Sequence, residues 1–131
     1  MVVIDTSAAI AMIRREPEAE EFVRVIALSS GRSYLSAVSL VEAALVLGGV
    51  QYTELMDLLR RLEVIVAEFD AAMATLAIGA ARRYGKGRGS KAQLNFGDCC
   101  VYATAKALRL PLLFKGKDFA HTDIVRATTQ A

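Results

Sequence analysis

Residues that hold soft metals or form disulfides are scarce in this sequence. It has one histidine, His121, and two cysteines, Cys99 and Cys100, which are adjacent in the chain. Because neighbouring residues on a helix point in different directions, we expect no disulfide between the cysteines, and no spaced pair exists to hold zinc. We expect both to be small core residues in a reducing cytoplasm. His121 is expected to have a local structural role rather than a catalytic one.

Targeting signals and long apolar spans are also absent. The most apolar run, residues 35–50, is too short to cross a bilayer and carries Glu42. The first residues, MVVIDTS, lack the charged and apolar regions of a signal peptide. No glycine-rich nucleotide-binding loop follows a predicted strand, which argues against nucleotide-cofactor chemistry. We therefore expect a soluble protein that does not enter membranes.

What the sequence does contain is short apolar runs alternating with longer helical patterns. Its 131 residues, 54% of them hydrophobic, suffice for one domain with a real core. The patterns predict strands at 2–4, 33–36, 64–69, 110–114 and near 123–125, and helices at 7–15, 17–30, 39–47, 51–63, 70–84 and from 98 onward. This alternation predicts an α/β fold with a mostly parallel central sheet flanked by helices on both faces. With no repeat or linker, residues 1–131 are predicted to form a single domain.

Four carboxylates stand where predicted strands and helices meet. Asp5 directly follows the first strand, and Asp118 follows the fourth strand across a turn. Glu42 lies early in the helix after the second strand, and Asp98 begins a helix. In an open parallel sheet, ligands collect outside the carboxyl ends of the strands, where the following helices also begin. We therefore expect the four acids to converge at one rim of the sheet.

Converging carboxylates need compensation. Two of them about 4 Å apart repel by roughly 4 kcal/mol at an effective dielectric constant near 20, so either one is protonated or a cation lies between them. Oxygen ligands without histidine or cysteine favour Mg²⁺, with Mn²⁺ as a substitute, and such ions assist phosphodiester hydrolysis. Three acids also have local alternatives: Asp98 as an N-cap, Glu42 in a capping box with Ser39, and Asp118 as an ordinary turn residue.

The segments around these acids resemble a known family. In order, from Met1 to about Ile124, they read VVIDTSAAIAMI, SLVEAALVL, LNFGDCCVYATAKALRLPLLF and KGKDFAHTDI. Together they resemble the PIN-domain ribonucleases, and more narrowly the VapC toxins of bacterial type II toxin–antitoxin pairs. The resemblance implies a metal-dependent endoribonuclease that leaves a 5′-phosphate and a 3′-hydroxyl.

The resemblance also implies roles for individual residues. The acids that it implies as catalytic are Asp5, Glu42, Asp98 and Asp118. Of these, Asp5 and Asp98 would be the principal Mg²⁺ ligands. Thr6 or Ser7 would supply a hydroxyl near the metal, and Asp123 would be either a fifth acid or a locally paired residue. All four principal acids are present, so an active enzyme is expected.

Positive charge is concentrated in one segment. Residues 82–91, RRYGKGRGSK, carry five cations and no acid, and removing these charges from the net +2 leaves −3 for the rest of the chain. We expect this segment to bind the phosphates of single-stranded RNA, with Tyr84 as a stacking surface, or else to be a solvated loop. Lys115 and Lys117 either steer phosphates or belong to a solvated turn.

The resemblance implies two protein partners, a second copy of the chain in a homodimer and a cognate antitoxin whose C-terminal segment enters the acidic groove. The apolar faces of the helices at 17–30 and 51–62 either make such contacts or belong to the core.

Other families with an aspartate at a strand end fit less well. A haloacid-dehalogenase-type phosphotransferase expects a second aspartate where this chain has Ser7, and a receiver domain expects an acidic pair that is not found. The remaining alternative is a non-catalytic RNA- or protein-binding PIN-like module.

Overall fold

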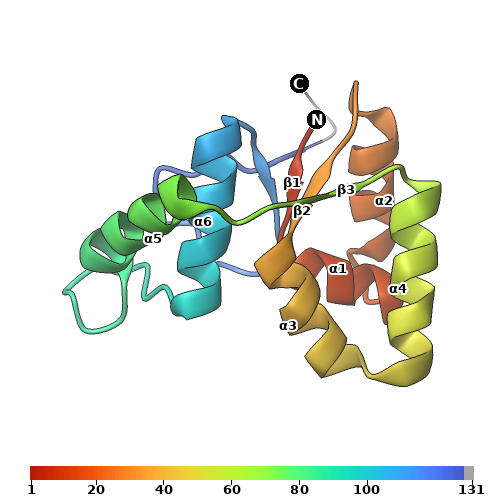
Figure 1. Ribbon diagram of the computed structural model, residues 1–131, viewed down its shortest axis with the longest axis horizontal. Helices are drawn as coiled ribbons and strands as arrows, with labels where there is room; N and C mark the ends of the chain where they lie inside the picture. Colours follow the sequence, from red (N-terminus) through yellow and green to blue (C-terminus); the bar gives the residue numbers. More distant parts are fainter. Residues whose placement is uncertain (129–131) are drawn as a thin grey trace.

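Four short parallel strands form the centre of the computed structural model, which describes residues 1–128 (Figure 1). The sheet has the order β3-β2-β1-β4. Its strands are β1 (Val3–Ile4), β2 (Tyr34–Ser36), β3 (Ile65–Ala67) and β4 (Leu112–Leu113). All neighbouring strands pair in parallel. The predicted parallel α/β fold is therefore confirmed, although each strand is shorter than the apolar run that predicted it.

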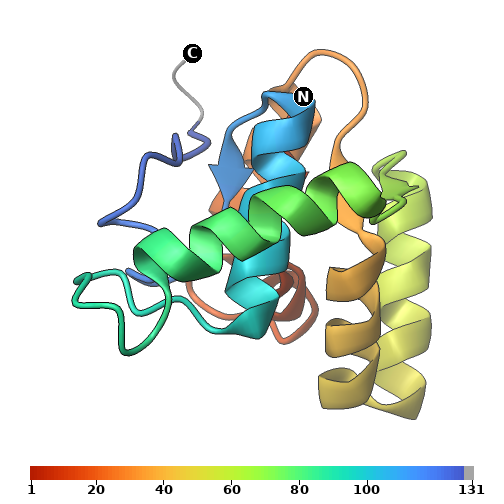
Figure 2. The same cartoon turned by 60° about the vertical axis from the view of Figure 1, so that its left-hand side comes forward.

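Within residues 1–128, six helices cover both faces of the sheet. They are α1 (Thr6–Ile13), α2 (Ala19–Leu28), α3 (Ala37–Leu47), α4 (Gly49–Arg61), α5 (Ala71–Tyr84) and α6 (Phe96–Leu108). Figure 1 shows α1, α2 and α4 on one side of the strands and α5 with α6 on the other. Turned by 60°, the molecule shows α5 crossing α6, and α3 beside α4 (Figure 2).

Strands β1 and β4 are buried on both faces, which explains why both are uninterrupted apolar runs. Successive side chains point to opposite faces. Ile4 and Leu113 therefore join the cluster formed with α1 to α4, while Val3 and Leu112 join the cluster formed with α5 and α6. All four side chains are at most 1% exposed.

Four helices, α1, α3, α4 and α6, begin earlier than the sequence patterns predicted, and three of them have a polar residue as N-cap. The N-cap of α1 is Asp5 rather than Ser7. The N-cap of α3 is Ser36, whose hydroxyl accepts from the Val38 amide at 3.1 Å. The N-cap of α6 is Asn95, and Asp98 is the third helical residue. Each true cap is a short polar side chain, and its position is decided by where the preceding strand or loop releases the backbone.

The shift of α3 overturns one alternative. A capping box of Ser39 with Glu42 is wrong, because both residues lie well inside the helix that Ser36 caps. The last predicted strand is also reduced: near residues 123–125 the chain makes only one isolated parallel bridge, between Leu112 and Arg126.

Two predictions about apolar residues are settled by packing. Cys99 and Cys100 are free and buried, as expected. The apolar faces of α2 and α4 belong to the core, through residues such as Phe22 and Leu55. Within residues 1–128, no helix is both long and apolar enough to cross a bilayer.

Candidate active site

The four predicted acids meet at the rim formed by the carboxyl ends of the strands. Asp5 follows β1, Glu42 lies on α3 after β2, Asp98 lies in the first turn of α6, and Asp118 lies in the turn after β4. Their mutual influence shows their proximity. The charges of Asp98 and Glu42 both act on Asp5, and those of Asp118 and Glu42 act on Asp98. Four segments distant in sequence thus supply one acidic cluster.

Asp5 is the most enclosed member of the cluster. Its side chain is 6% exposed, and its Oδ2 accepts from the Ser7 amide at 3.1 Å and the Ser7 hydroxyl at 2.5 Å. Burial raises the pKa of Asp5 to about 6; the Ser7 hydrogen bonds oppose this rise, and the Asp98 and Glu42 charges add to it. The Ser7 hydroxyl also accepts from the Lys115 amide at 3.0 Å, which ties the end of β1 to the end of β4.

Glu42 is held between a hydroxyl and a glycine. The Thr6 hydroxyl donates to Glu42 Oε1 at 2.8 Å. On the other side the carboxyl group lies against Gly97, where an added Cβ would stand only 2.8 Å from Glu42 Cδ. Real Cβ atoms do not approach so closely, so the side-chain-free position at 97 brings Glu42 beside the first turn of α6. Gly97, next to Asp98, was the sequence signal for this close contact with Glu42, and it was not recognised as one from the sequence.

Asp98 combines a capping role with membership of the cluster. Its amide donates to Asn95 Oδ1 at 2.8 Å, and its Oδ2 accepts from the Asn95 amide at 3.1 Å, which completes a capping box. Burial raises the pKa of Asp98; the Asn95 hydrogen bond lowers it, the Asp118 and Glu42 charges raise it further, and Lys86 lowers it. The alternative that Asp98 is the N-cap is therefore wrong, because Asn95 holds that position and Asp98 is its capping-box partner.

Asp118 is exposed, and it lies in a turn that is held by Arg126, a residue outside the predicted motifs. The Arg126 guanidinium donates to the carbonyls of Phe114 at 3.1 Å and Gly116 at 2.9 Å. It also lies 3.8 Å from the Phe114 ring centroid. Gly116 has a φ of +94°, which favours glycine. Arg126 is a positioning residue that sequence reasoning missed, because nothing in its local sequence connects it to the turn.

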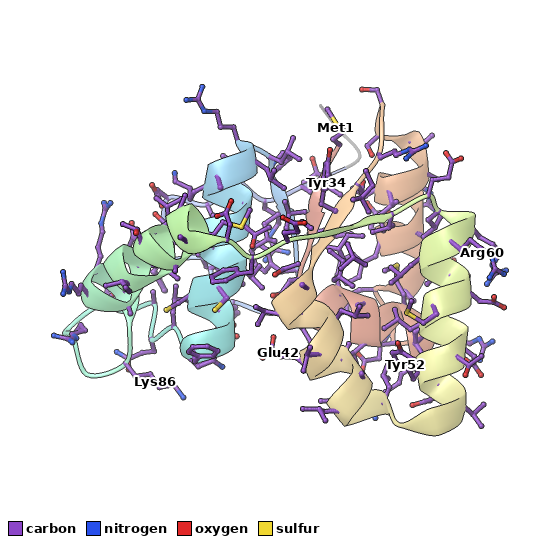
Figure 3. All side chains as sticks on the ribbon, viewed as in Figure 1. Met1, Tyr34, Glu42, Tyr52, Arg60 and Lys86 are labelled. Atoms are coloured by element: carbon purple, nitrogen blue, oxygen red, sulfur yellow. The ribbon has the colours of Figure 1, made fainter. Side chains whose placement is uncertain are left out.

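The basic segment lies beside the acids but differs in one respect from its prediction. Lys86 acts on Asp98, and Figure 3 shows Lys86 and Glu42 both toward the lower edge of the molecule. Tyr84, however, is buried, with its ring centroid 5.7 Å from that of Tyr102. The prediction that Tyr84 stacks on RNA is wrong, because the residue closes the core between α5 and α6.

Two other predicted groups are engaged locally. Lys115 forms ion pairs with Glu16 at 3.0 Å and Glu18 at 3.5 Å, which neither alternative for this lysine had foreseen; Lys117 is exposed. Asp123 accepts from the Tyr102 hydroxyl at 2.7 Å and pairs with Lys106 at 2.8 Å.

The electrostatics of Asp123 support its local role. Although burial raises the pKa of Asp123, the hydrogen bonds from Lys106 and Tyr102 lower it below its usual value. Of the two alternatives for this residue, local pairing is therefore the correct one. His121 is exposed, and its local structural role stays a prediction.

The chemistry of the cluster fits a hard divalent ion held by few protein ligands. All four side chains offer carboxylate oxygens, which Mg²⁺ prefers, and Mg²⁺ commonly uses one or two carboxylates while keeping several waters. As the side chains stand in residues 1–128, no three acidic, histidine or cysteine side chains group closely enough to form a complete metal cage. Glu42 is turned toward Thr6 and Asp98 toward Asn95.

Comparison with known proteins identifies the family of this chain. The PIN domain pattern matches residues 2–125, and the chain belongs to the PIN domain family. Within that family it belongs with the VapC ribonucleases: it is 44% identical to the VapC ribonuclease Mb0640 of Mycobacterium bovis over 94% of this chain and 95% of the relative.

Solved structures show the same fold. VapC20 of Mycobacterium tuberculosis, described as a sarcin–ricin loop cleaving toxin, superposes with a TM-score of 0.77 at 16% identity, over 98% of this chain and 99% of that one. A toxin–antitoxin complex from Klebsiella pneumoniae contains a chain with a TM-score of 0.71 at 18% identity, over 94% of this chain and 93% of that one.

Proposed function

We propose that this protein is a metal-dependent endoribonuclease that hydrolyses RNA phosphodiester bonds as the toxin of a toxin–antitoxin pair. The observation that carries the proposal is the convergence of four carboxylates from separate segments on one rim, where burial and mutual repulsion raise the pKa of Asp5 and Asp98. Such a cluster is stable when a cation neutralises it. Residues 1–131 act as a single domain in this proposal, and the names of the VapC relatives support the nuclease activity.

Asp5 and Asp98 are the proposed ligands of Mg²⁺, with Mn²⁺ as a substitute. Oδ2 of Asp5 accepts both Ser7 bonds, and Oδ2 of Asp98 accepts the Asn95 bond. The other carboxylate oxygen of each residue, Oδ1, is therefore the proposed ligand of the ion. When bound, the ion supplies a Lewis acid that polarises a phosphoryl oxygen.

The remaining acids handle the attacking water. Because Thr6 fixes Oε1 of Glu42, we assign Oε2 to accept a proton from that water. The same contact orients the water for in-line attack on the scissile phosphorus. Asp118, exposed at the mouth of the cluster, is the second proposed acceptor. A carboxylate can serve as a general base when its geometry is fixed, and the Thr6 hydroxyl provides that fixation for Glu42.

The residues that bind the RNA and the antitoxin are assigned from their charge. Lys86, Arg88 and Lys91 are exposed on the basic segment, and we assign them to RNA phosphates. The acidic rim suits a cation from an antitoxin, which would compete with the metal ion for the same carboxylates. Structural likeness to a chain of a toxin–antitoxin complex supports such a partner.

A homodimer in the cytoplasm completes the proposal. On α3, the apolar side chains of Val41, Leu45 and Val46 are 51–82% exposed, a surface suited to contact with a second copy. The free thiols of Cys99 and Cys100 support a reducing compartment.

RNA cleavage by the purified protein tests this function. We expect cleavage with Mg²⁺ or Mn²⁺, and its loss with EDTA or in Asp98→Asn, whose amide oxygen still accepts the Asn95 hydrogen bond. Asp57→Asn, an exposed acid paired with Arg60 on α4, is the matched control and should cleave normally. RNA binding without cleavage by the unaltered protein would instead favour the non-catalytic module. In addition, Mg²⁺ should raise the melting temperature, because it binds the folded state.

A further inference from the structure

An apolar groove lies beside the acidic cluster. It has a volume of about 640 Å³ and is lined mainly by apolar side chains of α5 and α6, among them Ile78, Ala81 and Cys99. Two cations, Lys86 and Arg88, and the first residue of α6, Phe96, complete its wall. None of the four rim acids lines it. It is therefore separate from the cluster yet shares the first turn of α6 with it.

Phe96 is exposed at a point where burial would be expected. Its side chain is 80% exposed, although it is one of the largest apolar groups in the chain. The backbone that carries Phe96 is held on both sides, because Asn95 is the N-cap of α6 and Gly97 lies against Glu42. Phe96 is also two residues before Asp98. An aromatic ring is thus held in water at the edge of the groove and next to the proposed metal ligand.

The charges at the groove identify the class of its occupant. Lys86 and Arg88 are exposed cations on the wall of an otherwise apolar groove. An occupant should therefore combine flat apolar surface with negative charge. Single-stranded RNA has both, since unstacked bases pack on aromatic side chains while cations hold the backbone. An apolar peptide gives these two cations no partner.

We propose that this groove receives an unstacked base of the RNA substrate, next to the phosphate being cleaved. Phe96 supplies the stacking ring, and Lys86 and Arg88 hold the flanking phosphates. This inference rests on the proposed ribonuclease function and adds to it a subsite for a base. It also gives the enzyme a preference for single-stranded RNA, because a paired base does not present its face to a side chain.

Fluorescence provides a direct test, because the chain contains no tryptophan. Phe96→Trp introduces a single indole at the groove, and adding Asp98→Asn prevents cleavage during the titration. We expect poly(A) to quench the emission through stacking. Inorganic polyphosphate, which carries the charge without bases, should leave the emission unchanged. Quenching by both polyanions, or by neither while poly(A) binds, would overturn the proposal.

Kinetics provide the second test. Phe96→Ala should raise KM for single-stranded RNA by about tenfold, the usual scale for losing one base–aromatic stack, whereas Phe96→Tyr should retain the original KM. Leu28→Ala is the matched control, since Leu28 is 69% exposed at the end of α2, away from the groove. An unchanged KM in Phe96→Ala would refute the base subsite.

The outcomes separate this inference from the function on which it rests. If the unaltered protein cleaves RNA and Phe96→Ala cleaves it equally well, the base subsite is wrong and the ribonuclease function stands. If the unaltered protein neither cleaves nor binds RNA with Mg²⁺, the function itself is wrong. A blue shift of the Trp emission with rising protein concentration or on adding the antitoxin, without quenching by poly(A), would assign the groove to a protein partner.

Discussion

The acidic rim and the outer helix α5 contain the same two features, an aspartate as N-cap and a glycine within a helix, but these features have different roles. Each has an aspartate as a helix N-cap: Asp5 caps α1, and Asp70 caps α5 by accepting from the Met73 amide at 2.9 Å. Each also has a glycine within a helix, Gly97 in α6 and Gly79 in α5.

Their surroundings differ completely. Asp5 is buried beside two other acids, whereas Asp70 is exposed. Gly97 lies against a carboxyl group, whereas an added Cβ at Gly79 would meet nothing within 4 Å. Local sequence chemistry thus creates a cap or a helix glycine, and only the tertiary neighbours make it part of a site.

The largest expected effect separates the two capping aspartates. Asp5→Asn should reduce RNA cleavage by at least about 100-fold, because it removes a charge that we assign to the metal ion. Asp70→Asn should cleave like the unaltered protein, since asparagine caps helices as well as aspartate. Initial rates with saturating Mg²⁺ measure both. Equal rates in the two variants would contradict the distinction.

The next effect is a pH dependence of stability that belongs to Asp5. Its pKa is about 6 in the folded protein and 3.8 ordinarily, so the folded state binds this proton more tightly. The resulting stabilisation is present below about pH 4 and is lost as the pH rises through 6. The loss is about 3 kcal/mol in metal-free protein.

Urea unfolding in EDTA measures this pH-dependent loss of stability. Between pH 4 and 7.5, the unaltered protein should lose stability relative to Asp5→Asn, while Asp70→Asn should follow the unaltered protein. Parallel curves for all three would show that Asp5 has an ordinary pKa.

The two glycines should respond to alanine in different ways. Gly97→Ala displaces the Glu42 carboxyl group, which should slow RNA cleavage, whereas the free energy of unfolding should change little, because that carboxyl group ends a flexible side chain. Gly79→Ala should raise the free energy of unfolding by about 0.5–1 kcal/mol, because alanine is the better helix former and the position is open. Denaturant unfolding and initial rates distinguish these results; a stabilised, fully active Gly97→Ala would remove the argument for that close contact.

The smallest effect concerns Asp70 alone. Asp70→Ala removes the hydrogen bond to the Met73 amide and should lower the free energy of unfolding by about 1 kcal/mol. RNA cleavage should stay unchanged, since α5 contributes none of the four acids. Thermal unfolding and an activity assay on one preparation test both statements. A loss of activity without a loss of stability would connect α5 to catalysis.

The rim could be predicted because it depends on topology. Once the apolar runs at β1 and β4 were recognised as parallel strands, Asp5 and Asp118 had to end near each other. The true cap of α3 at Ser36 was missed because Ser39 offers the same local pattern, and only the point where β2 ends distinguishes them. Tyr84, Lys115 and Arg126 were misassigned or missed for another reason. Their partners come from segments distant in sequence, and packing alone brings those segments together.

The Ser7 hydroxyl has a consequence for how the protein can be observed. A hydroxyl has a single hydrogen, and this one is directed to Asp5, which leaves an oxygen lone pair for the Lys115 peptide N–H. The backbone amide of Lys115 is therefore one oxygen atom away from the carboxylate. Its resonance in a nitrogen–proton correlation spectrum should move whenever Asp5 gains a proton or a cation, giving the rim a natural spectroscopic probe.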